Sequence, residues 1–161
     1  MDILGIRFTP KLIYFVIVNN QGEKLSWENS NDSHKIKIPE NISETGELLN
    51  WFYKEFNSIF TKYKNIEQIA FKEPEYKGNV NNGSFRRRIY YEGLLQYWAY
   101  ENELPIIRKT YTGFRNGKRV IKKDERLDYC KNNIINCEEL KNNELVDAIL
   151  AARSACMSSG K

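Results

Sequence analysis

Apolar residues in the first quarter of the chain recur with the short spacing of β-strands. Two strand-sized apolar runs come first, and an Asn- and Gly-containing turn at 19–22 separates them from two weaker strand patterns. These short runs and turns predict an antiparallel meander, which Pro39 ends. The predicted strands are Asp2–Phe8 and Leu12–Val18, and the weaker patterns lie at Lys24–Trp27 and Lys35–Ile38; three antiparallel strands are expected in all.

Beyond Pro39 the apolar spacing becomes helical and alternates with short strands. A helix that opens at Ser43 carries an apolar stripe from Leu48 to Tyr63. Strand and helix then alternate until two helices close the chain, so the predicted order is β-β-β-α-β-α-β-α-α. After the first helix, the pattern predicts strands at Ile66–Lys72 and Pro105–Ile107, helices at Ser84–Asn102, Lys118–Asn132 and Asn142–Met157, and a loop at Thr110–Gly117.

This order predicts an α/β domain with a mixed five-stranded sheet and helices on both faces. The length of 161 residues fits a single domain over 1–161, and the sequence contains no internal repeat. On the last predicted helix, Ala148, Ala151 and Ala155 share a face with Glu144 and Asp147. Because alanine side chains are small, we expect this face to lie close against the sheet.

The composition excludes two broad classes of protein. Hydrophobic residues make up 41% of the chain and charged residues 29%, which is too apolar for a disordered protein and too polar for a membrane protein. The longest apolar run, Leu12–Val18, is far shorter than the ~20 residues that span a bilayer. The chain opens directly on a predicted strand, with no secretory signal, so we expect a cytoplasmic protein.

Side chains for thiol, zinc or histidine chemistry are scarce. The three cysteines, Cys130, Cys137 and Cys156, form no CxxC motif and cannot all pair, so free thiols in a reducing compartment are expected. The only histidine, His34, lies in a polar, turn-like stretch. This pattern disfavours both a zinc site and a hydrolase with a histidine base.

Positive charge is concentrated in the second half of the chain. The net charge is +4, but the segment 84–126 holds eleven Lys and Arg against five Asp and Glu, an excess of six, so the rest is slightly acidic. Aromatic residues are interleaved with these cations, as in surfaces that bind a phosphate backbone and unstacked bases. A solvated face is the alternative interpretation. The candidate nucleic-acid-binding residues are Arg86, Arg87, Arg88, Lys118 and Lys122.

Three carboxylates occupy positions that a sheet-based phosphodiesterase would use. Glu73 follows a predicted strand, and Glu144 and Asp147 are one turn apart on the last helix. Clustered carboxylates hold Mg²⁺ or Mn²⁺, and two such ions stabilise the attacking and leaving oxygens of a phosphodiester. Solvated acids, or a helix-start charge at Glu144, are the alternative interpretation.

These residues resemble the RuvC Holliday-junction resolvase branch of the RNase H-like superfamily. The first strand of that branch reads Ile-Leu-Gly-Ile-Asp, where this chain reads Ile3-Leu4-Gly5-Ile6-Arg7. Its catalytic Glu at the end of the fourth strand is similar to Glu73, and its two acids followed by alanine are similar to Glu144–Ala148. Its glycine-containing helix resembles Tyr91-Glu92-Gly93-Leu94. The resemblance implies an RNase H-like fold and structured DNA as the substrate class.

A small uncharacterised bacterial family of RNase H-like proteins provides a second resemblance. Its outline has a Lys-Glu pair, a Pro-Lys-Gly motif, a Gly-rich loop and a basic helix. Here Lys72-Glu73, Tyr76-Lys77-Gly78 and Asn82-Gly83, followed by Arg86 to Arg88, are similar to that outline.

Arg7 is the main departure from the RuvC pattern. The first-strand Asp of that branch bridges two metal ions, whereas a guanidinium is a permanent cation that cannot ligate a metal. We expect Arg7 to pair with Glu73 and Asp147 in place of Mg²⁺ or Mn²⁺, because clustered acids without a cation would repel one another. The resemblance then implies a nucleic-acid-binding protein, for DNA more than RNA, on a nuclease scaffold with an impaired metal site.

Two alternative functions stay open. One is an active Mg²⁺- or Mn²⁺-dependent endonuclease or resolvase, in which the three carboxylates hold the metal and the three consecutive arginines hold phosphates. The other is a non-catalytic subunit of a larger protein complex, anchored by Trp27, Tyr111 and Phe114. Because RuvC-like nucleases act as dimers, the resemblance also implies a homodimer.

Overall fold

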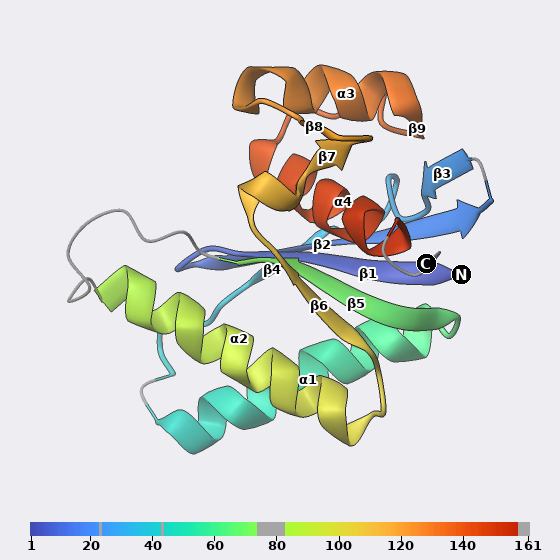
Figure 1. The fold of residues 1–161 in the computed structure, drawn as a ribbon. Helices are drawn as coiled ribbons and strands as arrows, with labels where there is room; N and C mark the ends of the chain where they lie inside the picture. Colours follow the sequence, from blue (N-terminus) through green and yellow to red (C-terminus); the bar gives the residue numbers. More distant parts are fainter. Residues whose placement is uncertain (23, 43, 74–82, 158–161) are drawn as a thin grey trace.

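The computed structural model describes residues 1–22, 24–42, 44–73 and 83–157, with 84–86 described by their backbone alone. A mixed sheet of seven strands forms its centre (Figure 1), in the order β6-β5-β1-β2-β3-β9, and β4 also pairs with β2. The strands are β1 (Asp2–Phe8), β2 (Leu12–Gln21), β3 (Lys24–Trp27), β4 (Lys35–Lys37), β5 (Ile66–Lys72), β6 (Ile106–Lys109) and β9 (Ile134–Ile135).

The strand pairing confirms the mixed α/β architecture. β1 runs antiparallel to β2, with Gly5 opposite Val16, and parallel to β5, with Gly5 beside Ala70. β6 continues the sheet parallel to β5. The sheet is wider than the five strands expected, because both weaker patterns form separate strands, β3 and β4, and the unpredicted strand β9 joins the edge. A strand as short as β9 has too few residues to show an alternating pattern.

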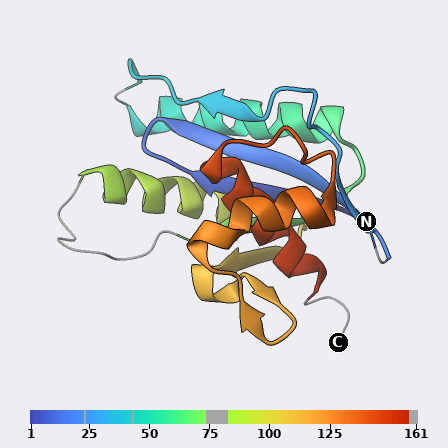
Figure 2. The same ribbon diagram turned by 90° about the horizontal axis from the view of Figure 1, so that it is seen from above.

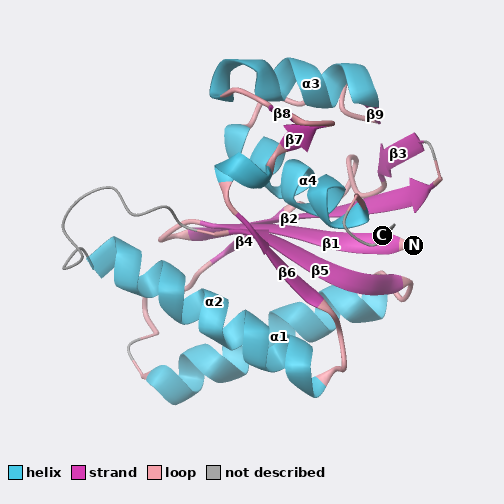
Figure 3. Ribbon diagram, viewed as in Figure 1, coloured by secondary structure: helices cyan, strands magenta, loops and turns pink. Residues whose placement is uncertain are grey.

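Helices cover both faces of the sheet. The helices α1 (Thr45–Lys62) and α2 (Gly83–Glu101) lie on one face, and α3 (Arg126–Asn133) and α4 (Asn143–Cys156) lie on the other (Figure 3). The view from above shows α3 outside α4 (Figure 2), so α4 makes the main helical contact with this face. None of the described helices is both long and apolar enough to cross a membrane.

The two faces are packed with different side chains. Aromatic rings fill the space under α1 and α2, where Phe52 and Phe56 stack with ring centroids 4.3 Å apart and Trp98 is fully buried. Small residues fill the space under α4, including Ala148 and Ala152. Because strand side chains alternate in direction, neighbouring positions of β1 contribute to opposite cores.

Gly5 explains how α4 comes so near to the sheet. A methyl group at Gly5 would overlap the backbone carbonyl oxygen of Ala148 and lie 2.8 Å from the side chain of Val16. The absence of a side chain at Gly5 therefore allows the helix backbone to rest on β1. The expected close approach of the alanine face to the sheet is confirmed.

The predicted basic helix Lys118–Asn132 is wrong over its first half. Residues Arg115–Asn116 (β7) and Arg119–Val120 (β8) form a hairpin, with Gly117 at a φ of 58° in its turn. A 3₁₀ turn at Lys123–Glu125 follows, and α3 begins only at Arg126. The expected loop at Thr110–Gly117 contains a 3₁₀ turn at Tyr111–Gly113 as well as β7. Gly117, with its positive φ, and Lys118 turn the chain between β7 and β8, so the first residues of the predicted helix form the second strand of a hairpin instead.

Candidate nucleic-acid interface

One end of the sheet gathers charged side chains from several elements. Arg7 and Lys72 are neighbours in register at the C-terminal ends of β1 and β5. The helices α2 and α4 both begin on the side of the molecule where these strands end (Figure 1). We call the group at this end the ionic centre; its members are Arg7, Lys72, Arg88, Glu92, Tyr111, Arg126 and Asp147.

Asp147 of α4 is the anion around which the ionic centre forms. Its Oδ2 atom lies 3.5 Å from Nε of Arg7, and its Oδ1 atom lies 3.7 Å from Nη1 of Arg126. The hydroxyl of Tyr111 donates a hydrogen bond of 2.9 Å to Oδ2. Burial raises the pKa of Asp147, although Tyr111, Arg7 and Arg126 each act to lower it. Each carboxylate oxygen of Asp147 thus faces a guanidinium group.

Tyr111 packs against two cations in addition to binding Asp147. The Nζ atom of Lys72 lies 3.7 Å from the centroid of the ring, and Cζ of Arg126 lies 3.9 Å from it. Lys72 is fully buried and also donates to the backbone oxygen of Glu73. Cation–π contacts of this kind stabilise buried positive charge. The ring therefore holds two cations beside Asp147.

Glu92 adds a second buried carboxyl group on the α2 side. Burial and the nearby charge of Glu73 raise its pKa to about 7, while Arg7, Arg88 and Lys72 act in the opposite direction. Within the described part of the chain, Oε1 of Glu92 has no hydrogen-bond partner. Burial, followed by the positive charge of Arg7, lowers the pKa of Arg88. Positive charge is thus in excess at this end of the sheet.

The three predicted metal ligands, Glu73, Glu144 and Asp147, have different surroundings and do not form one cluster with Arg7. Asp147 pairs with Arg7, as expected, but Glu73 pairs with Arg108 at 3.9 Å. No ion pair joins Arg7 to Glu73 in the described residues, so that half of the expected pairing is wrong. Glu144 is half-buried in the first turn of α4. Across the described ranges, no three His, Cys, Asp or Glu side chains are grouped so that they could hold a metal ion.

The predicted basic residues fall into two groups. Arg87 is exposed on the first turns of α2, and Arg88 is half-buried towards the ionic centre. Lys118 and Lys122 are exposed beside the β7–β8 hairpin on the α4 side. The side chain of Arg86 and the loop 74–82, which includes the motif Tyr76-Lys77-Gly78, lie outside the described residues.

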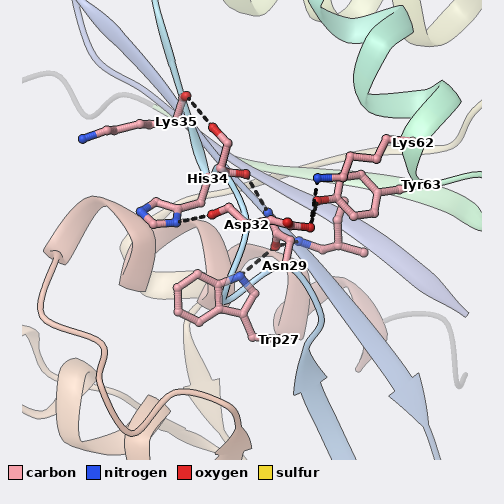
Figure 4. Close-up of polar contacts among 9 residues, drawn as sticks. Trp27, Asn29, Asp32, His34, Lys35, Lys62 and Tyr63 are labelled. Atoms are coloured by element: carbon pink, nitrogen blue, oxygen red, sulfur yellow. Dashed lines mark hydrogen bonds and ion pairs between the residues drawn. The ribbon is translucent and has the colours of Figure 1, made fainter.

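The three aromatic residues expected to anchor a protein partner are not exposed. Trp27 is 5% exposed and Phe114 is fully buried, while Tyr111 is half-buried in the ionic centre. In Figure 4, Nε1 of Trp27 donates a 2.7 Å hydrogen bond to Oδ1 of Asn29, an oxygen that also accepts from the backbone of Ile17. The expected anchoring surface is therefore wrong, because these rings are part of the interior.

Histidine and thiol chemistry has no support in the structure. His34 is half-buried and packs its ring edge against Trp27, with Nδ1 3.1 Å from the backbone oxygen of Asp32 (Figure 4). The cysteines are free thiols, as expected. Burial raises the pKa of Cys137 to about 12 and of Cys156 to about 11, so both stay protonated.

Sequence reasoning did not assign Lys72, Glu92 or Arg126 to the site. For two of them, the neighbouring apolar residues in the sequence indicate burial. Lys72 directly follows the buried apolar run Ile69-Ala70-Phe71, and Glu92 shares a helix face with the buried residues Leu95 and Ala99. Arg126 gave no such indication, because it appeared to be one more charge on an exposed basic helix.

The strand order, the two helical layers and the position of the ionic centre define the class of fold. The fold is RNase H-like and similar to that of solved RuvC structures, so the fold that the sequence resemblance implied is confirmed. No protein-family model matches the sequence, and a search of the curated proteins finds no match.

Similar solved structures include RuvC from Thermus thermophilus, which is 13% identical with a TM-score of 0.78 over 99% of this chain and 95% of that one. RuvC of the same organism in complex with a Holliday junction substrate is 15% identical, with a TM-score of 0.75 and the same coverage. Fowlpox virus resolvase in complex with substrate Holliday junction DNA is 15% identical, with a TM-score of 0.58 over the whole of both chains.

Proposed function

We propose that this protein binds structured or branched DNA at the end of the sheet that carries the ionic centre, and that its metal site is impaired. The observation that carries the proposal is the pairing of Arg7 with Asp147, because it sets a fixed cation beside a carboxylate that the RuvC pattern assigns to metal. Two of the similar structures hold Holliday-junction DNA, which supports DNA as the partner.

The residues of the ionic centre do not fit a divalent cation. Mg²⁺ and Mn²⁺ need carboxylate oxygens with free lone pairs, yet each oxygen of Asp147 faces a guanidinium. Lys72 adds a third fixed cation near the Tyr111 ring. A metal ion here would be repelled by these charges in a buried, weakly screened setting. We therefore derive no hydrolytic step for this centre.

Positive side chains around the end of the sheet supply what a DNA backbone needs. Arg87 and Arg108 are exposed there, and Arg88, next to Arg87 on α2, is half-buried. Lys118 and Lys122 extend the positive charge on the α4 side. Lysine and arginine that neutralise phosphates release counterions, which gives an affinity that falls steeply with salt.

The DNA-binding part is tested with a labelled four-way junction in EDTA. We expect binding to weaken as salt rises, and the double variant Arg87→Ala/Arg88→Ala to lower the affinity by about tenfold, because each lost phosphate contact removes favourable ion release. Lys64→Ala is the matched control, since this exposed residue lies at the opposite end of β5. Equal losses in the control and the double variant would contradict the proposed surface.

The impaired metal site is tested by thermal melting with and without Mn²⁺. We expect no Mn²⁺-dependent rise in Tm for the natural chain, and a rise for Arg7→Asp, because the substitution removes a cation and adds a carboxylate beside Asp147. Stoichiometric Mn²⁺ binding by the natural chain, or junction cleavage that is lost in Glu73→Ala, would instead support the endonuclease.

A homodimer remains a prediction, which sedimentation of the DNA-free protein can check.

A further inference from the structure

A groove of about 790 Å³ lies beside the ionic centre, on the α1–α2 face of the molecule. It is bounded by the β1–β2 turn, by the connection from β4 to α1 and by the first half of α2, which Figure 1 shows next to one another. Its walls are mainly apolar and aromatic, including Ile38, Pro39, Leu48 and Tyr90. This volume lies within the range of pockets that hold a small molecule or a single nucleotide.

The floor of the groove is attached to the strand that carries Arg7. Tyr91 is 3% exposed, and its ring lies 6.2 Å from that of Phe8, the residue after Arg7 on β1. Tyr90, one position earlier, is 38% exposed, and its ring lies 6.5 Å from that of Tyr91. One tyrosine thus supports the groove from below, while the other presents its ring to a ligand.

Two consecutive arginines connect the groove with the ionic centre. Arg87 lines the groove, whereas Arg88 is half-buried near Arg7, whose charge acts on it, and near Glu92 at the end of the sheet. Successive residues of a helix point about 100° apart, so adjacent arginines can serve two neighbouring surfaces. A nucleic-acid strand that passes the end of the sheet would have its next nucleotide at the mouth of the groove.

The charges of the groove favour an anionic chain with a flat apolar group. Arg87 and Lys11 line the groove, and Glu40, the one acid among its described lining residues, pairs with Lys11 at 3.8 Å. An exposed aromatic ring in a positively charged groove is the arrangement with which proteins stack unpaired bases while tracking the backbone. A fully paired duplex offers no free base to this ring.

We propose that this groove binds an unpaired nucleotide of the DNA, stacked on Tyr90 with its phosphate at Arg87. The inference rests on the proposed function, and it adds a preference for DNA in which a single-stranded segment leaves a branch point.

The test compares a four-way junction that carries a short single-stranded tail with the same junction lacking the tail, both in EDTA. We expect the tail to raise the affinity of the natural chain at least about fivefold, because stacking one base on an aromatic ring has an effect of that order. Tyr90→Ala is expected to abolish this gain, and Tyr90→Phe to keep it. Tyr100→Ala, an 80% exposed tyrosine on the same helix and outside the groove, is the matched control and is expected to keep the gain.

A 2-aminopurine base in the tail reports stacking directly. Its fluorescence is expected to fall on binding to the natural chain and to Tyr100→Ala, but not to Tyr90→Ala. A junction that binds equally well with and without the tail overturns the groove proposal while leaving the proposed function intact. Failure of the natural chain to bind either junction overturns both.

Discussion

The contact between β1 and α4 has an apolar half and a charged half. At Gly5 the strand has no side chain, and the backbone of α4 rests on it at Ala148. Two residues later, on the same face of the strand, Arg7 meets Asp147 among further charged groups. One helix and one strand thus form an apolar contact at one end and a buried ionic one at the other.

The difference shows which half maintains the fold and which half is available for function. Close apolar packing needs no polar compensation and is hard to alter without overlap. A buried charge cluster contributes little net stability, because desolvation offsets much of the attraction, but breaking it leaves charges without partners. The ionic half therefore stabilises the fold only weakly. Its side chains can be exchanged for others with a different charge more easily than the residues of the apolar half.

The largest expected effect is that of Asp147→Ala. The substitution leaves the guanidinium groups of Arg7 and Arg126 buried without their carboxylate, and losses of about 3–5 kcal/mol are typical when one partner of a buried ion pair is removed. Urea denaturation measures the free energy of unfolding. The double variant Asp147→Ala/Arg7→Met should recover part of the loss. A single variant as stable as the natural chain would show that the pairing has no energetic role.

Gly5→Ala is expected to follow, with a loss of about 3 kcal/mol, because the new methyl group overlaps a backbone oxygen that cannot move independently of α4. Gly93→Ala is the matched control. In the part of the chain that the structure describes, no atom beyond the backbone of its own helix lies within 4 Å of the added methyl group, and alanine is a better helix former by about 1 kcal/mol. The first substitution should lower the urea midpoint and the second should raise it; the same sign for both would contradict this packing.

The apolar half was predictable from sequence, and the ionic half only in part. The alanines at helical spacing on the last helix and the apolar run Ile3–Ile6 predict close packing of helix and strand. The local sequence pattern and the tertiary contact agree there. The pair Arg7–Asp147 was expected from the resemblance. The roles of Lys72 and Arg126 were not. The apolar run before Lys72 indicates burial but not its partners, and the sequence around Arg126 is typical of a solvated charge, because the residues that cover it are distant in sequence.

The α2 side of the ionic centre provides a prediction of pH dependence. The pKa of Glu92 is raised to about 7 in the folded protein from an ordinary value near 4.5, so the folded state retains a proton that the unfolded state has lost between these pH values. This group therefore destabilises the fold progressively as the pH rises from about 4.5 to 7, and fully above that.

Glu92→Gln should remove that dependence. The stability gain over the natural chain is expected to be near zero at pH 4.5 and to reach about 2–3 kcal/mol at pH 8, where the buried charge is fully present. Unfolding by urea at a series of pH values gives the difference between the two proteins, in which the other titrating groups largely cancel. A difference that does not change with pH would mean that Glu92 titrates normally.

The smallest effect is expected for Tyr111→Phe, which separates the hydrogen bond of the ionic centre from its ring. The variant loses the 2.9 Å bond to Asp147 but keeps the ring on which Lys72 and Arg126 pack, so a loss of about 1 kcal/mol in the free energy of unfolding is expected. Tyr111→Leu removes the ring as well and should be clearly worse, because Lys72 and Arg126 then lose their contact with it and Arg126 keeps only the more distant Phe114 ring. If both variants unfold at the same urea concentration, the Tyr111 ring contributes nothing to holding the two cations.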